Sequence, residues 1–117
     1  MGKILVVDDT PDCLRPLSRL LKLEGHSVEC AGDGQQALNV LETFTPDTII
    51  LDLMMPVMDG VTFLELMRLN PRWHDIRVVV YTGYDAGPRV QRLAALGVSE
   101  VLLKAVDGLD HLLQIVA

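Results

Sequence analysis

Residues 48–60 read TIILDLMMPVMDG, and the rest of the chain is best understood from this segment. It opens with an apolar run, Ile49–Leu51, whose length and β-branched side chains are typical of a strand buried on both faces. Asp52 follows where that strand should end, and a proline and an Asp-Gly pair then favour a loop before the next helix. A carboxylate in that position would lie at the crevice where open α/β sheets bind ligands.

Asp52 by itself has a simpler interpretation, as a residue that ends a strand and caps a turn. Other strand ends favour the functional interpretation. Asp8 and Asp9 directly follow the first apolar run, and Thr82 and Lys104 follow two later ones. Because right-handed crossovers place the carboxyl ends of all parallel strands on one edge of a sheet, we expect these five side chains to lie close together.

Strand and helix signals alternate along the whole chain, with no linker or low-complexity segment between them. The predicted strands cover residues 3–7, 27–31, 49–51, 77–81 and 100–103. The predicted helices cover residues 11–24, 34–44, 61–69, 88–96 and 108–116. The polar connection over residues 72–75 predicts that Trp73 and His74 lie on the surface. Five strand–helix units in succession predict an α/β protein whose parallel sheet is covered by helices on both faces.

Several helix ends carry their own sequence signals. Thr10 and Asp33 are predicted N-caps of the first two helices, and Asp107 is the predicted cap of the last helix. Gly25 and Gly97 are expected just past the carboxyl ends of the first and fourth helices, where glycine accepts a left-handed backbone.

The composition predicts one cytoplasmic domain over residues 1–117. That length is near the common domain size and allows a real core, and half of the residues are hydrophobic. No apolar run approaches the length of a membrane span, no signal peptide is visible, and Cys13 and Cys30 show no metal-binding spacing. The net charge of −6 argues against direct binding of nucleic acid, but it suits protein partners and a cation held by clustered acids.

The predicted edge of the sheet gathers the groups needed for phosphoryl transfer. Three carboxylates in one crevice repel one another, and a divalent ion that prefers oxygen ligands, such as Mg²⁺, relieves that repulsion. Lys104 adds a positive charge and Thr82 adds a hydroxyl donor, and both could neutralise charge on a transferred phosphoryl group. A carboxylate could itself be the nucleophile and form an acyl phosphate.

With these residues in this order, the chain resembles the receiver domain of two-component response regulators over essentially its whole length. The acidic pair of that family matches Asp8 and Asp9, and its phosphoacceptor aspartate matches Asp52. Its hydroxyl residue matches Thr82, and its lysine matches Lys104. The resemblance implies a flavodoxin-like (βα)5 doubly wound parallel sheet with strand order 2-1-3-4-5.

The resemblance also implies a function. Asp52 would accept a phosphoryl group from a phosphohistidine of a sensor histidine kinase or phosphotransfer protein, with Mg²⁺ as cofactor. Asp9 and Asp52 would bind the metal directly, joined by the main-chain carbonyl of Met54, and Asp8 would act through water. The chain would be an enzyme only in assisting its own phosphorylation and dephosphorylation. A downstream protein would bind the face formed by the fourth helix, last strand and fifth helix.

Two positions depart from the family pattern. The family usually has a cis Lys-Pro bond where this chain has Lys104-Ala105, and a trans bond is expected here because a cis bond before a non-proline residue costs about 3 kcal/mol. The family also has an aromatic switch residue where this chain has Val101. We therefore expect the loop over residues 83–87, with Tyr84, to carry the change that follows phosphorylation.

Two other functions remain open on the sequence. A pseudo-receiver would bind a partner constitutively without phosphate, and Val101 and Ala105 favour it, whereas the complete acidic set and Lys104 oppose it. A phosphatase of the haloacid dehalogenase type would need a second aspartate two residues after the nucleophile, and this chain has Met54 there.

Overall fold

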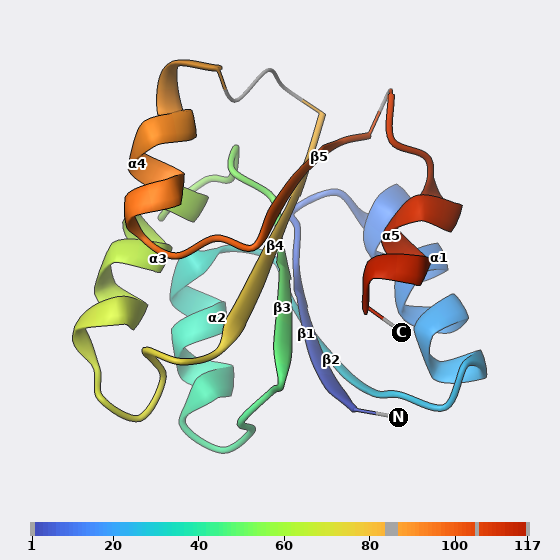
Figure 1. The fold of residues 1–117 in the computed structure, drawn as a ribbon. Helices are drawn as coiled ribbons and strands as arrows, with labels where there is room; N and C mark the ends of the chain where they lie inside the picture. The colour runs from blue at the N-terminus through green and yellow to red at the C-terminus, as the bar shows by residue number, and fades with distance from the viewer. Residues whose placement is uncertain (1, 84–86, 105, 117) are drawn as a thin grey trace.

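The computed structural model describes residues 2–83, 87–104 and 106–116, and it has five parallel strands between two layers of helices (Figure 1). The strands are β1 (Lys3–Val7), β2 (Ser27–Ala31), β3 (Thr48–Leu51), β4 (Arg77–Thr82) and β5 (Glu100–Leu103). The helices are α1 (Pro11–Leu23), α2 (Gly34–Leu41), α3 (Gly60–Leu69), α4 (Val90–Ala95) and α5 (Leu109–Val116), with a 3₁₀ turn, η1 (Gly87–Arg89), before α4. The strand order is β2-β1-β3-β4-β5, so the predicted flavodoxin-like fold is confirmed. No helix within the described ranges is long and apolar enough to cross a membrane.

The register of β1 and β3 makes these two strands end at the same level, whereas β4 continues for two more residues. Val7 of β1 pairs with Leu51 of β3, and Leu51 pairs in turn with Val80 of β4. The backbone N–H of Asp52 then donates to the Val7 carbonyl at 2.9 Å, which extends the ladder by one residue. Residues that follow β1 and β3 therefore emerge side by side at the carboxyl edge of the sheet.

Each face of the sheet buries its own apolar cluster. Since successive strand residues point to opposite faces, Leu5 and Val7 join the cluster under α2, α3 and α4, whereas Ile4 and Val6 join the cluster under α1 and α5. Figure 1 shows these two helical layers on either side of the sheet. Every residue of β3 is buried, which explains the continuous apolar run that follows Thr48 in this strand.

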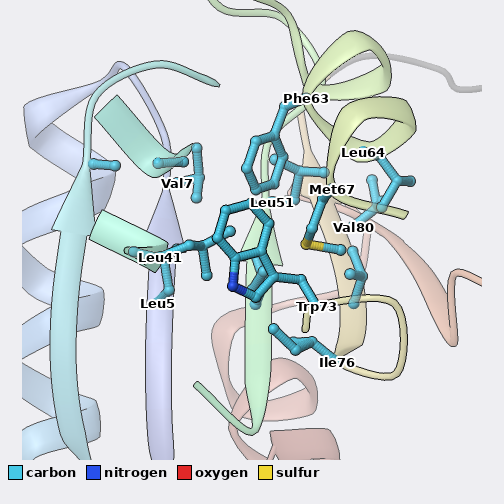
Figure 2. Close-up of a cluster of buried hydrophobic side chains, with 14 of the residues drawn as sticks. Leu5, Val7, Leu41, Leu51, Phe63, Leu64, Met67, Trp73, Ile76 and Val80 are labelled. Carbon is cyan, nitrogen blue, oxygen red and sulfur yellow. The ribbon is translucent and has the colours of Figure 1, made fainter. Parts of the chain in front are cut away.

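The surface position predicted for Trp73 is wrong. Its side chain is only 6% exposed, and Figure 2 shows the indole among Leu51, Met67 and other buried side chains. The backbone N–H of Trp73 donates to the Asn70 carbonyl at 3.0 Å in a turn after α3, which returns the chain to the core. The polar neighbours of Trp73 concealed this burial in the sequence, whereas His74 is exposed as predicted.

The side chain of Arg68 joins α3 to the far end of α4. Its Nε donates to the Leu96 carbonyl at 2.8 Å, and a second nitrogen lies 3.4 Å from the Gly97 carbonyl. Its third nitrogen donates to the carbonyls of His74 at 2.9 Å and Ile76 at 2.7 Å. One guanidinium thus provides hydrogen-bond donors for carbonyls of two loops, one of which directly follows α4.

The helix ends follow the sequence signals in part. Gly25 and Gly97 have φ values of 95° and 78° and lie just past α1 and α4, as predicted. α2 ends earlier than predicted, and α4 begins only at Val90 because η1 precedes it. α5 begins at Leu109, so the predicted cap, Asp107, lies two residues before the helix instead of next to it. One oxygen of its carboxylate accepts the backbone N–H of Leu103 at 2.9 Å, which ties the loop after β5 back to that strand.

Candidate functional site

Three carboxylates lie together at the carboxyl edge of the sheet. One oxygen from each of Asp8, Asp9 and Asp52 lies within 4.8 Å of the other two. Asp8 and Asp52 are buried, whereas Asp9 is exposed. The strand register explains the juxtaposition, because Asp8 and Asp52 each follow the last paired residues of β1 and β3. The predicted cluster of acids is therefore present.

Asp8 also fixes the start of α1. Its Oδ1 accepts the backbone N–H of Thr10 at 2.9 Å. Thr10 occupies the N-cap position as predicted, but its hydroxyl makes no capping hydrogen bond. Asp33, by contrast, caps α2 as predicted by accepting the N–H of Gln36 at 2.8 Å. The first helix is thus anchored to the acidic cluster rather than to its own cap.

Lys104 supplies the positive charge. Its Nζ lies 2.6 Å from Oδ2 of Asp8 and 3.8 Å from Oδ2 of Asp52, and its side chain is only 18% exposed. The backbone N–H of Lys104 donates to the Thr82 carbonyl at 2.8 Å, which continues the pairing of β4 and β5 beyond the last strand residue. The ammonium therefore offsets part of the carboxylate charge and contacts Asp8 more closely than Asp52.

Burial and neighbouring groups both act on the carboxyl group of Asp52. Burial raises the pKa of Asp52 above its ordinary value, and the nearby charge of Asp8 raises it further. A hydrogen bond from the Thr82 hydroxyl, the charge of Lys104 and the backbone N–H of Met54 all act to lower that pKa. Thr82, at the end of β4, is fully buried.

Oδ1 of Asp52 is buried, and none of the described groups donates a hydrogen bond to it. A buried carboxylate oxygen without a hydrogen-bond donor lowers the stability of the folded chain unless it meets a proton, a cation or an incoming electrophile. With three carboxylates nearby, the donor set fits a hard divalent cation such as Mg²⁺, which prefers oxygen ligands. A metal contact through the Met54 carbonyl stays a prediction.

The loop after Asp52 requires glycine at position 60. A Cβ built on Gly60 would lie 2.5 Å from the Asp52 carbonyl oxygen and 2.9 Å from Cα of Leu53. The Gly60 N–H donates to the Leu53 carbonyl at 3.0 Å, so the start of α3 is pressed against the end of β3. Asp59 caps this helix by accepting the N–H of Thr62 at 2.8 Å. Sequence reasoning identified the turn but gave no signal for this close approach.

Val57 has a backbone conformation that valine seldom adopts. Its φ is 65°, and the Met58 N–H donates to the Pro56 carbonyl at 2.6 Å across a three-residue turn. The side chain of Val57 is 85% exposed, so packing does not compensate the conformation. A β-branched residue with positive φ is strained, and this strain lies in the loop that carries Met54.

Two further features of the site bear on the sequence expectations. The ring of Tyr81, which the sequence indicated only as a strand residue, lies with its centroid 5.8 Å from Nζ of Lys104. Val101 is half-buried and packs against the cluster under α2, α3 and α4. Tyr84 and Ala105 lie outside the described residues, so the role of Tyr84 in the change that follows phosphorylation and the trans Lys104-Ala105 bond stay predictions.

Comparison with known proteins gives a consistent result. The sequence model of the response regulator receiver domain family matches residues 4–117 of this chain. The chain is 41% identical over 107 residues to response regulator PleD of Caulobacter vibrioides, which covers 91% of this chain and 23% of that protein. It is 35% identical over 103 residues to a probable chemotaxis protein CheY of Rhizobium etli, which covers 87% of this chain and 80% of that protein. The chain spans only 17% of protein RcaC of Microchaete diplosiphon, to which it is 36% identical over 110 residues, covering 93% of this chain.

Solved structures agree with the sequence comparison. Chemotaxis response regulator CheY4 of Vibrio cholerae matches with a TM-score of 0.88 and 30% identity, over 99% of this chain and 96% of that one. Response regulator TrrA of Thermotoga maritima, in complex with Mg(2+)-BeF, matches with a TM-score of 0.83 and 28% identity, over the same shares of the two chains. Both similarities extend over essentially the whole chain described above.

Proposed function

The chain belongs to the family of response regulator receiver domains, and we propose on that basis that Asp52 is the residue that accepts the phosphoryl group. A receiver domain is the phosphorylatable switch of a two-component system. The observation that carries the assignment is Oδ1 of Asp52, which is buried and accepts no hydrogen bond from the described groups. Its partner oxygen faces Lys104, so Oδ1 is the atom of this carboxylate best suited to attack phosphorus.

The transfer forms an O–P bond to Asp52 and breaks the N–P bond of a phosphohistidine on the partner. The imidazole leaves with the bonding electron pair and takes up a proton. Lys104 neutralises charge on the phosphoryl oxygens, and the buried Thr82 hydroxyl donates to one of them. Lys104 is already 3.8 Å from Asp52, so it reaches the new group by a small movement away from Asp8.

The metal that completes this chemistry is Mg²⁺ in our proposal. Asp9, Asp52 and the main-chain carbonyl of Met54 would hold it, with Asp8 acting through water. The ion would supply positive charge for the phosphoryl oxygens and would relieve the repulsion among the carboxylates. The TrrA structure, solved as a complex with Mg(2+)-BeF, supports this choice by similarity.

The partners and the output follow from the same assignment. A sensor histidine kinase or phosphotransfer protein on the cytoplasmic side would donate the phosphoryl group, and a downstream protein would bind the face of α4, β5 and α5. We propose no direct contact with nucleic acid, since the net charge is −6. Val101, a valine where the family carries its switch aromatic, indicates that coupling to this face differs from the usual route.

The test is phosphorylation with Mg²⁺ and a small phosphodonor such as phosphoramidate, followed by intact-mass measurement. Wild type should gain the mass of one phosphoryl group, and Asp52→Asn should gain none. Asp59→Asn is the matched control, because Asp59 lies in the same loop and an asparagine can still cap α3. Constitutive partner binding with no mass gain in wild type would favour the pseudo-receiver instead.

A further inference from the structure

Tyr81 lies on the same side of the sheet as Lys104. It pairs with Leu102 in the register of β4 and β5, and Lys104 follows two residues later, on the same face. Tyr81 is 8% exposed and belongs to the apolar cluster under α1 and α5. The side chain of Thr82, one residue on, points to the opposite face, so the two neighbours approach the site from different sides.

The Tyr81 ring and the Lys104 ammonium form a cation–π pair. Nζ lies 5.8 Å from the ring centroid, inside the distance at which such pairs attract. The Lys104 side chain is only 18% exposed, and partial removal from water strengthens the attraction. The ring is itself held by packing against α1 and α5, so its position does not depend on the state of the carboxylates.

Lys104 needs such a guide because its side chain is long and flexible. Its ammonium contacts Asp8 at 2.6 Å but must act at Asp52, from which it is 3.8 Å away. A conformer in which the ammonium has left Asp8 without reaching Asp52 does not assist the reaction, and a lysine side chain has many such rotamers. A fixed aromatic face beside the ammonium reduces the number of such conformers.

We propose that Tyr81 is a positioning residue for phosphoryl binding: its ring holds the Lys104 ammonium beside the crevice while the ammonium transfers from Asp8 to the phosphoryl group on Asp52. The inference rests on the proposed function, because it assigns a task to Lys104 in that reaction. The ring is the active feature, so phenylalanine should replace tyrosine and leucine should not.

The experiment compares Tyr81→Phe, Tyr81→Leu and Val79→Ala. Val79 is the matched control, because it lies on β4, in the same apolar cluster, two residues before Tyr81. The first readout is the affinity for beryllofluoride in the presence of Mg²⁺. The second is the NMR chemical shift of the Lys104 methylene protons next to Nζ without phosphate or metal, because an aromatic ring displaces the resonances of protons over its face.

Tyr81→Leu should bind beryllofluoride about three- to tenfold more weakly, the factor that a partly buried cation–π pair supplies. Tyr81→Phe and Val79→Ala should bind as wild type does. The Lys104 methylene resonances should be displaced in wild type and Tyr81→Phe and should return to ordinary values in Tyr81→Leu.

Unchanged methylene shifts in Tyr81→Leu would overturn the positioning role, as would an equal loss of affinity in Val79→Ala. A wild-type chain that binds no beryllofluoride would contradict the proposed function, and the methylene shifts would still decide whether the ring holds Lys104.

Discussion

At the scale of single residues, the Asp52 carboxyl is buried and lies near both the negative charge of Asp8 and the positive charge of Lys104. The raised pKa means that the folded chain keeps the Asp52 proton in a range above pH 3.8 where the unfolded chain loses it. Since the folded state then binds more protons, the stability contributed by this group is present at low pH and is lost as pH rises through the folded pKa. The folded chain is therefore less stable when Asp52 is ionised, which is the form that would attack phosphorus.

Asp52→Asn should accordingly stabilise the metal-free chain at neutral pH. The advantage of the variant over wild type should grow as pH rises from about 4 to about 7, because only wild type must ionise a buried carboxyl. Urea unfolding across that range measures it. Glu29→Gln, which neutralises an exposed carboxylate on β2, controls for the loss of one charge. A gap between Asp52→Asn and wild type that did not change with pH would contradict the argument.

The backbone strain at Val57 also lowers the stability of the fold. Val57→Gly should raise the free energy of unfolding by about 1 kcal/mol, because it relieves a φ of 65° that costs valine more than the entropy that glycine loses. Val90→Gly is the control, as another exposed valine, with the helical backbone of α4, and it should lower stability by about 0.5–1 kcal/mol. The prediction fails if both substitutions destabilise the chain equally.

At the scale of elements, the junction of β3 and α3 is determined by close backbone contact. Gly60→Ala should lower the free energy of unfolding by about 2–4 kcal/mol, because the added methyl meets backbone atoms that cannot rotate away. Gly83→Ala is the comparison, since its Cβ would meet no atom of the described residues within 4 Å, and it should leave stability unchanged or slightly higher. Thermal or urea unfolding of both variants decides the matter, and a mild effect at position 60 would refute the contact.

Arg68 makes the second element-scale contact that can be tested. Arg68→Lys should lower the free energy of unfolding by about 2–4 kcal/mol, because an ammonium cannot reach carbonyls in two loops at once. Arg72→Lys is the matched control: its exposed pair with Glu42 at 2.9 Å should be worth under about 1 kcal/mol. Similar losses at the two positions in urea unfolding would show that the carbonyl contacts of Arg68 contribute little.

At the scale of the whole molecule, bound metal should stabilise the fold. If Mg²⁺ binds only the native state, a concentration of about 100 times the Kd adds about 2.7 kcal/mol to the free energy of unfolding. Asp9→Ala should weaken that effect and raise the metal-free melting temperature, because it removes one of three clustered charges. Melting curves with and without Mg²⁺ test this, with Glu29→Gln as control. An equal Mg²⁺ response in Asp9→Ala and wild type would contradict the site.

The sequence predicted the parts of this molecule that depend on local pattern. The parallel sheet and the meeting of Asp8, Asp52 and Lys104 followed from apolar runs that end in polar residues, because parallel topology brings such ends together. The strand order followed instead from the resemblance to receiver domains. Burial of Trp73 and the bonds of Arg68 could not be predicted, since both depend on how a loop folds back over a distant element. The same holds for the cation–π contact of Tyr81, which joins neighbouring strands.

The anchoring of α4 by Arg68 has a mechanical consequence. Arg68 contacts the carbonyls of Leu96 and Gly97, just past the last turn of α4. A rearrangement that preserves those contacts would rotate the helix about that end. The 6 residues of α4 form a helix about 9 Å long, so a rotation of about 10° moves its Val90 end by about 1.6 Å while the other end stays in place. The displacement is thus greatest at the Val90 end of α4, which follows η1. The stiffness of the Arg68 contacts determines how much of the helix motion is rotation and how much is translation.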